Sequence, residues 1–326
     1  MSIVKSSWIS LHRFFTFPLP PASLGIFRIL IASFTILQAF LWYPDWLSFF
    51  GPDAWVQWEI SNALVPEMSI HISRLYQLFA FSGISETQFV IIFFWIYVFV
   101  ALGLLIGWHT RSFAILTWFW HYVIMCSIDI YVYGVDIFLQ IALFYFMFMP
   151  INKALSLDAF RKSVNKNPSW TVTLSMRVFQ IHLCLIYLSS GYEKMLSPGW
   201  WNGNTLWRSL VQPDFNQFSF EWLANYPWIV ITLSCFTMFI EAGYCIAMWI
   251  PRMRVFWLAA IILLHSGIAV FLGLWLFGLI MILLSVSAFG YDALLDIRHW
   301  YKKRKLRRTN SMQFQTIDGA HPIIMG

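Results

Sequence analysis

Long apolar runs occupy most of this sequence, and they constrain its fold more than any other feature. Eight runs stand out, and most approach the roughly 20 residues that an α-helix needs to cross a bilayer. They cover residues 22–43, 88–107, 112–128, 135–150, 174–194, 227–249, 254–272 and 274–290. Hydrophobic residues make up 60% of the chain, more than the interior of a soluble domain of 326 residues can bury. We therefore predict an all-α, polytopic membrane protein, a bundle of about eight transmembrane helices.

The loops between these runs differ in charge. If the runs cross the membrane in alternation, seventeen of the 21 Lys and Arg residues fall on the side of both termini. Only Arg74 and Arg208 lie in loops on the opposite side. Basic residues concentrate on the cytoplasmic side of membrane proteins, so we predict a multi-pass protein with both termini in the cytoplasm. This distribution also accounts for the net charge of +6, and nucleic acid is not an expected partner.

Composition divides the chain into three parts. Residues 1–21 contain the pattern of a short amphipathic helix on the cytoplasmic surface, ended by prolines. Residues 22–297 form the transmembrane domain, and residues 298–326 are predicted to be a basic, disordered cytoplasmic tail. Of the outer loops, residues 44–87 carry apolar side chains at helical spacing and residues 195–226 are rich in tryptophan. We expect amphipathic helices at the outer membrane interface.

Polar side chains inside the apolar runs are candidate functional residues, but most have a structural explanation. Arg28 is close enough to the end of its span to reach the membrane surface, and Asp136 begins a span, where a carboxylate caps the helix. His121 and His182 are expected to be packed, hydrogen-bonded histidines. Glu241 is interpreted as a protonated group, the partner of a cation such as Arg28, or part of a proton path, and a structural and a functional role are equally favoured. No His/Glu pair has metal-ligand spacing, so no metal site is predicted.

Lys194 ends the run 174–194 at the predicted outer face. A lysine there is commonly a helix-end residue that reaches the lipid headgroups. Here, however, Tyr187 and Ser190 precede it by seven and four residues on the same helical face, which makes a polar stripe directed into the bundle. Burial in such a crevice disfavours the charged form of a lysine and favours its use as a general base. The neighbouring Glu193 points elsewhere, and His265 falls in the outer half of its own run.

Three stretches of this sequence together resemble one family. Residues 187–207, YLSSGYEKMLSPGWWNGNTLW, are similar to a Tyr-x-x-x-Gly-x-x-Lys segment that is followed by Trp and Gly. Residues 131–158 are similar to a span that closes with Pro and SLD, and residues 265–285 to a His-bearing helix and the helix after it. These segments occur in this order in the HTTM (horizontally transferred transmembrane domain) family and its relative, the vitamin K-dependent γ-glutamyl carboxylase. The resemblance covers about residues 22–290.

The resemblance implies a fold and a function. It makes Lys194 the base that deprotonates a reduced quinone, a vitamin K-like cofactor, and His265 a residue that positions or stabilises the substrate. The residues expected to bind substrate or cofactor beside them are Tyr187, Ser190, Asp129, Tyr133, Trp200 and Glu241. We accordingly expect a lyase or another quinol-dependent enzyme of the bacterial plasma membrane. Its expected partners are membrane lipids and an extracytoplasmic peptide or protein.

The sequence also departs from the carboxylase. Asp129 stands where the carboxylase has a histidine, and Glu193 stands where it has a lysine. The resemblance does not extend to the lumenal domain that binds the propeptide of a protein substrate, so protein γ-carboxylation is not the expected reaction. The alternative function is a non-catalytic membrane scaffold or immunity-type protein that binds a partner through the outer loops, residues 44–87 and 195–226. A transporter is less favoured, because the sequence has no internal repeat.

Overall fold

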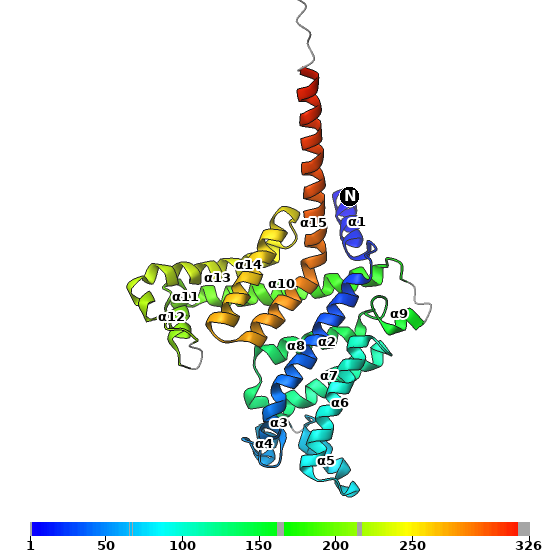
Figure 1. Ribbon diagram of the computed structural model, residues 1–326, viewed down its shortest axis with the longest axis vertical. Coiled ribbons are helices and arrows are strands. Elements are labelled where there is room, and N and C mark those ends of the chain that lie inside the picture. Colours follow the sequence, from blue (N-terminus) through cyan, green and yellow to red (C-terminus); the bar gives the residue numbers. More distant parts are fainter. Residues whose placement is uncertain (1, 65, 67, 162–165, 214–216, 319–326) are drawn as a thin grey trace, which may run out of the picture.

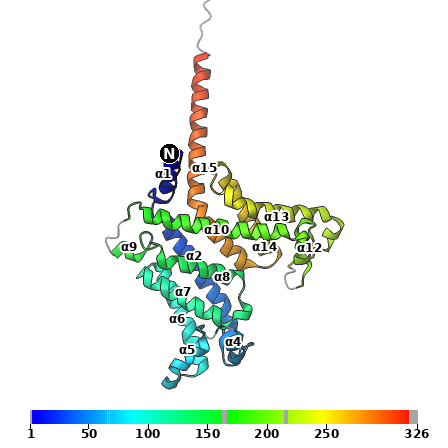
Figure 2. The ribbon, with the colours of Figure 1, turned by 180° about the vertical axis from the view of Figure 1, so that it is seen from behind.

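The chain folds as a helical bundle. The structure, a computed structural model, describes residues 2–64, 66, 68–161, 166–213 and 217–318, and these residues form helices and connecting segments without a β-strand. Figures 1 and 2 show the bundle from two sides, with the end of the last helix projecting from it. The predicted all-α class is confirmed.

Six helices of the described residues are long and apolar enough to cross a membrane. They are α2 (Ala22–Trp42), α6 (Glu86–Ile106), α10 (Trp170–Leu196), α13 (Pro227–Ala247), α14 (Pro251–Phe271) and the first part of α15 (Trp275–Asp318). The two remaining apolar runs also fold as helices, α7 (Thr110–Ser127) and α8 (Gly134–Phe148). However, α8 spans only about 22 Å, and α7 mixes Thr, Arg and His with its apolar residues. The predicted count of eight spans is therefore not confirmed.

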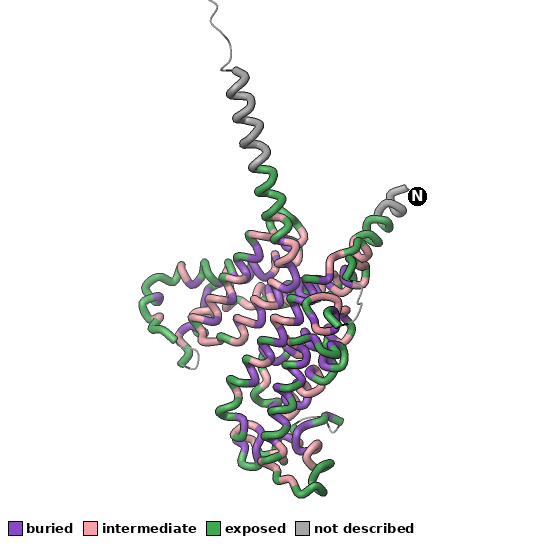
Figure 3. The backbone as a smooth tube through the Cα atoms, turned by 45° about the vertical axis from the view of Figure 1, so that its right-hand side comes forward, coloured by how far each residue is buried: buried purple, intermediate pink, exposed green. Residues whose placement is uncertain are grey.

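The long helices pack as two connected groups. Helices α2, α6, α7 and α8 form one group, and α10, α13, α14 and α15 form the other. Helix α15 joins the groups, because it also contacts α2 and α8. Aromatic rings fill the junction: the ring centroid of Phe27 on α2 lies 4.8 Å from that of Phe146 on α8 and 4.6 Å from that of Phe179 on α10. Figure 3 shows the buried residues concentrated where the helices meet.

Shorter helices occupy the two ends of the bundle. We call the end with α1 (Ser2–Thr16), α9 (Leu157–Arg161) and the C-terminal part of α15 the chain-end face (Figure 1). The opposite end is the loop face. Its helices form two groups that lie apart in Figure 1: α3 (Trp46–Phe50), α4 (Trp58–Leu64) and α5 (Ile72–Phe79) connect α2 to α6, and α11 (Pro198–Trp201) and α12 (Asn204–Val211) connect α10 to α13. Turns of 3-10 helix cover Tyr43–Asp45, Ala80–Ser82, Asp129–Tyr131 and Glu221–Asn225. The segments expected to be amphipathic helices at the N-terminus and in the first outer loop are helical.

The basic tail differs from its prediction. Helix α15 continues without a break through the segment that was expected to be disordered, as far as Asp318. The remaining residues, 319–326, lie outside the described part of the chain. Helix propagation from a packed nucleus costs little per residue, and Lys and Arg are good helix formers. These properties account for a helix where composition alone predicted disorder.

Arg28 is held inside the bundle. The residue is fully buried, and its guanidinium donates hydrogen bonds to the carbonyl oxygens of Leu104 and Leu105, at the end of α6, and of Leu155. A cation at a helix C-terminus stabilises the last carbonyl groups and interacts favourably with the helix dipole. The prediction that Arg28 reaches the membrane surface is therefore wrong, because these three carbonyl groups bind it in the interior.

Other polar residues within the apolar runs have the structural roles expected of them. The Asp136 carboxylate accepts a hydrogen bond from the backbone N–H of Tyr133 at 3.2 Å, which caps α8. His121 is buried, with Nδ1 3.0 Å from the hydroxyl of Tyr97. The Nδ1 atom of His182 lies 2.8 Å from a tyrosine hydroxyl on α8. These interactions explain the three side chains without a catalytic role.

Candidate functional site

The last turn of α10 carries the candidate base. The Nζ atom of Lys194 lies 2.6 Å from the Oε2 atom of Glu241 on α13 and 2.6 Å from the Oγ atom of Ser190. Ser190 in turn donates a hydrogen bond to the same carboxylate oxygen at 3.1 Å, so the three groups form a closed set. Only 20% of the Lys194 side chain and 6% of the Glu241 side chain are exposed. The structure therefore gives Lys194 a largely buried, hydrogen-bonded carboxylate partner.

A close approach of two helices makes this pairing possible. Gly191 lies one turn before Lys194, and a Cβ atom at this position would lie 2.5 Å from the backbone nitrogen of Ala242 on α13. Only glycine allows the backbones to come so near, as small residues do at helix interfaces in membranes. Ala242 directly follows Glu241. The contact thus fixes the depth at which the carboxylate of α13 meets the lysine of α10.

The turn after α10 covers the lysine. Pro198 begins the short helix α11, which brings the ring of Trp200 over Lys194, with Nζ 5.3 Å from the ring centroid. The Oγ atom of Ser234 on α13 donates to the carbonyl oxygen of Trp200 at 2.5 Å and holds this turn against the bundle. A ring face stabilises a nearby ammonium group electrostatically. Lys194 is therefore enclosed by a carboxylate, a hydroxyl and an indole.

His265 lies on α14 and contacts Tyr187, the next polar residue of the α10 stripe. Its Nε2 atom is 2.8 Å from the hydroxyl of Tyr187, which is also 3.2 Å from the Oγ atom of Ser285 on α15. The ring of Tyr187 packs on that of Tyr244 on α13, with the centroids 4.2 Å apart. His265 is 2% exposed, and its Nδ1 atom is buried with no hydrogen-bond partner in the described part of the chain. An unpartnered imidazole nitrogen at this depth is available to bind a ligand atom.

Six of the eight predicted site residues come together in this cluster, and two do not. Asp129 lies in an exposed 3-10 turn before α8, and Tyr133 lies just before the start of that helix. Burial, and next the Asp136 carboxylate, raise the pKa of the Tyr133 phenol to about 12, so the phenol stays protonated at neutral pH. Their segment approaches the cluster only indirectly. Gly134, the residue after Tyr133, packs against the ring of Phe277, and the centroid of that ring lies 6.0 Å from the centroid of the His265 ring. The structure describes no contact of Asp129 or Tyr133 with Lys194.

The structure gives Glu241 a cationic partner. Its partner is Lys194, whereas Arg28 binds backbone carbonyl groups at the opposite end of the bundle. Glu193 is exposed and accepts a hydrogen bond from Ser189 on its own helix at 3.1 Å, so it points away from the cluster as helical geometry predicted. The pairing of Lys194 with Glu241 could not be anticipated, because Lys194 lies in the last turn of α10 whereas Glu241 is the fifteenth residue of α13.

Two members of the cluster were not anticipated. Ser285 on α15 is fully buried beside Tyr187, and the hydroxyl of buried Tyr244 has no hydrogen-bond partner among the described residues. Each of these two residues has a sequence feature that could have predicted its place in the cluster. Ser285 is a polar residue within an apolar run, and Tyr244 follows Glu241 by three residues on the same face of α13.

The cluster can move a proton and bind a polar group in an apolar setting. It contains an amine, a carboxylate that can accept the proton of that amine, and a buried imidazole with one unpartnered nitrogen. No three His, Cys, Asp or Glu residues of the described chain are grouped as metal ligands. Glu241 and Trp200 cover most of the Lys194 side chain, of which 20% stays exposed.

Comparison with known proteins identifies the family. No curated protein and no solved structure matched this chain. The model of the HTTM domain, by contrast, matches residues 17–292, which include α2, α6, α10, α13 and α14 and the first part of α15. An integral, multi-pass membrane protein follows from these helices and this domain. The chain therefore belongs to the HTTM family, a carboxylase-related family of membrane proteins.

Proposed function

We propose that this HTTM protein is a membrane-embedded enzyme in which Lys194 removes a proton from a lipophilic, quinol-like substrate near the loop face. The observation that carries the proposal is the hydrogen-bonded set of Lys194, Glu241 and Ser190 between two membrane helices. Ionisable groups inside a membrane are costly to the fold and commonly mark proton or substrate paths. We infer that this cluster lies on the extracytoplasmic side, because the basic residues concentrate in the loops and termini on the other side of the predicted spans.

Glu241 gives the lysine a means of becoming a base. An ammonium group cannot accept a proton, so Lys194 must first lose one, and the carboxylate oxygen at 2.6 Å is in position to take it. A neutral amine beside a neutral carboxylic acid avoids the cost of keeping two charges in a medium of low dielectric constant. Exclusion of water by an apolar substrate favours this neutral pair. The amine is then free to take a proton from a hydroxyl group of the substrate.

His265 fits the binding of a polar group on such a substrate. Tyr187 holds Nε2 at 2.8 Å and leaves Nδ1 buried and unpartnered, so Nδ1 can bond to a substrate oxygen. A reduced quinone fits this combination, since it supplies an acidic hydroxyl group, a second oxygen and an apolar ring. In this proposal Lys194 and His265 are catalytic residues, Tyr187 positions the imidazole, and Trp200 excludes water from the lysine. The products or clients are extracytoplasmic peptides or lipids.

The base assignment is tested with a reduced naphthoquinone as probe. The full-length protein in nanodiscs is mixed with the probe without oxygen, and the absorption of the bound probe is recorded, because a hydroxyl group that loses its proton absorbs at longer wavelength. Lys194→Arg keeps a cation opposite Glu241, but arginine is not deprotonated in proteins. We expect the long-wavelength band in the wild type and its loss in Lys194→Arg.

The matched control is Arg254→Lys. This variant also exchanges the cation of an ion pair, Arg254 with Asp296 at 2.6 Å, but on the chain-end face. It should keep the band. If Lys194→Arg retains the band at wild-type intensity, the amine is not the base and the proposal fails.

A second function, a scaffold that binds a partner, is favoured by two observations. Lys194 is enclosed in this conformation, and the first outer loop exposes large apolar side chains. Met68 is 93% exposed and Phe81 is 88% exposed. Exposed apolar patches of this kind commonly mark binding surfaces. If the scaffold is correct, Phe81→Ser abolishes crosslinking to an extracytoplasmic partner in native membranes, while Lys194→Arg leaves both the crosslink and the biological activity unchanged.

A further inference from the structure

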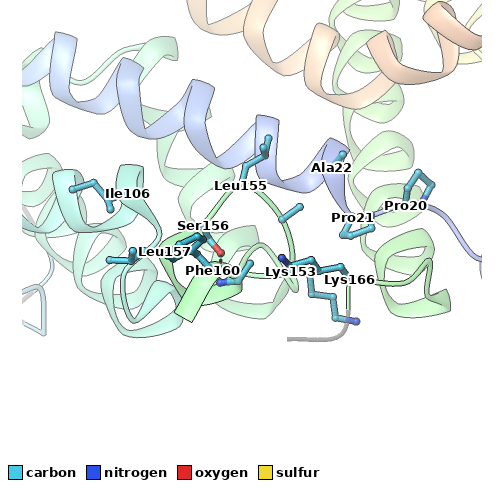
Figure 4. Close-up of a pocket in the computed structure, with 12 residues that line it drawn as sticks. Pro20, Pro21, Ala22, Ile106, Lys153, Leu155, Ser156, Leu157, Phe160 and Lys166 are labelled. Carbon is cyan, nitrogen blue, oxygen red and sulfur yellow. Dashed lines mark hydrogen bonds between the residues drawn. The ribbon is translucent and has the colours of Figure 1, made fainter. Parts of the chain in front are cut away.

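A groove on the chain-end face, far from Lys194, has the features of a binding site. It lies between the start of α2, the end of α6 and the segment 153–160, and its volume is about 680 Å³. Figure 4 shows Ile106 and Leu157 toward one end of the groove and Lys153, Lys166 and Pro20 toward the other. We propose that this groove binds one anionic phospholipid. The proposal is independent of the proposed function.

The positive charge of the groove is not neutralised by the protein. Lys153 donates hydrogen bonds to the hydroxyl groups of Ser169 at 3.0 Å and Thr171 at 3.3 Å, and Lys166 is exposed. Neither lysine has a carboxylate partner within the ranges that the structure describes. The acidic residue of this segment, Asp158, directs its carboxylate into the bundle instead. A phosphate group would supply the missing negative charge.

Asp158 is committed to a structural role. Its two carboxylate oxygens accept hydrogen bonds from the backbone N–H groups of His109 at 3.0 Å and Thr110 at 2.8 Å, and from the Thr110 hydroxyl at 2.7 Å. These bonds cap the N-terminus of α7. They also tie the segment 153–160 to the turn between α6 and α7, so the wall of the groove is fixed to two membrane helices.

A hydrogen bond from the bundle also holds Leu155, another residue that lines the groove. Leu155 has a φ of 52°, a left-handed conformation that is strained for a leucine, and its carbonyl oxygen accepts a hydrogen bond from Arg28. The buried guanidinium thus holds this residue in place. The groove is therefore preformed and does not depend on a ligand for its shape.

The apolar wall lies at the level where the membrane spans end. Ala22 is the first residue of α2, and Ile106 is the last residue of α6. Ile106 is 54% exposed, Leu155 is 57% exposed and Phe160 is 86% exposed. Large apolar side chains next to lysines at the end of a span are typical of the interface between hydrocarbon and headgroups.

These features together select the occupant. A soluble anion would use only the lysines, and a neutral lipid would use only the apolar wall, whereas an anionic phospholipid uses both. A second groove of about 450 Å³ shares Lys153 and includes Arg111 and Trp170, which adds a third cation to the same short stretch of surface. Anionic lipids are concentrated in the cytoplasmic leaflet, and basic pockets between membrane helices on that side bind their headgroups.

The test is a lipid titration of the full-length protein followed by native mass spectrometry. Phosphatidylglycerol and phosphatidylcholine with identical acyl chains are compared on the wild type and on Lys153→Gln/Lys166→Gln. We expect one phosphatidylglycerol to bind the wild type in preference to phosphatidylcholine. The double variant should lose roughly 25-fold in affinity for phosphatidylglycerol, the combined effect of two lysines near an anionic headgroup.

Two controls keep the result interpretable. Lys302→Gln/Lys303→Gln removes two exposed lysines from α15 on the same face and should change the affinity by less than about twofold, because they line no groove. Lys166→Gln alone changes an exposed residue that has no ion pair among the described residues, so a loss of about fivefold in this variant reports binding and not folding. Equal affinity of the wild type for the two lipids would overturn the proposal. So would an equal loss in the α15 variant, or full displacement of the lipid by millimolar inorganic phosphate.

Discussion

Alanine in place of Gly191 tests whether the approach of α10 to α13 sets the geometry of the site. The new Cβ atom would lie 2.5 Å from the backbone nitrogen of Ala242 and 2.9 Å from its Cα atom, whereas ordinary contacts begin near 3.4 Å. Backbone atoms cannot rotate away as a side chain can. The two helices must therefore separate locally by about 1 Å, the kind of backbone shift that overpacking forces.

The energy of this change has two opposing parts. Overpacking a well-packed interface costs about 1 to 3 kcal/mol, and replacing glycine by alanine inside a helix recovers up to about 1 kcal/mol. The expected net loss is about 1 to 2 kcal/mol in the free energy of unfolding. The separation also lengthens the contact between Lys194 Nζ and Glu241 Oε2 from 2.6 Å toward about 3.5 Å, where a hydrogen bond is no longer made.

The measurement is reversible unfolding of the full-length protein in mixed micelles, driven by SDS and followed by circular dichroism. The matched control is Gly267→Ala on α14, where the nearest atom to the new Cβ is a ring carbon of Phe271 at an ordinary 3.8 Å. That variant should gain about 0.5 to 1 kcal/mol from helix propensity and reduced chain entropy. If Gly191→Ala is as stable as the wild type or more stable, the helices are not held at their contact limit and the reasoning is refuted.

Two further predictions concern other parts of the bundle. Arg28→Met removes the guanidinium donor from one buried and two partly buried carbonyl groups and should cost about 3 kcal/mol in the same unfolding titration. Wild-type stability in this variant would show that the guanidinium is dispensable. In the first outer loop, burial, and next the charge of Arg74, lower the pKa of His71 below 6.5. Because folding then favours the neutral ring, the stability of this loop should fall as the pH drops below that value. Protease cleavage within residues 44–87 should rise between pH 7.5 and pH 5 in the wild type, and a His71→Gln variant that shows the same rise would contradict this cause.

The helical period accounts for what the sequence predicted at the site. Tyr187, Ser190 and Lys194 share one face of a helix by their spacing, and the structure places all three on the inner side of α10. The same geometry predicts that Glu193 points away from Lys194, and in the structure Glu193 bonds to Ser189 on its own helix instead. Apolar composition was sufficient for the all-α class. Helical period and apolar composition depend only on residues that are close together in the sequence, so each can be predicted from a single segment of the chain.

Pairings between helices depend on relative depth, which no single segment determines. Lys194 is in the last turn of α10, but Glu241 is the fifteenth residue of α13, so counting residues inward from the loop face places them at different depths. The segment that follows α10, with α11 and α12, contacts α13, and Ser234 on α13 bonds to Trp200, so part of α13 packs against residues beyond the end of α10. Arg28 was misjudged for a related reason. Its distance from the span end is short, but the carbonyl groups that bind it come from α6 and from the segment before α9.

Tyr187 stands where four helices meet, and this has a consequence for genetic screens. Its hydroxyl group joins α10 to α14 through His265 and to α15 through Ser285, and its ring packs on α13 through Tyr244. Substitutions that adjust the site will therefore also change the amount of folded protein in the membrane. A survey that scores only cellular activity would confuse lost chemistry with lost abundance at these positions. Variant effects here need to be divided by the quantity of folded protein before any residue is assigned a role.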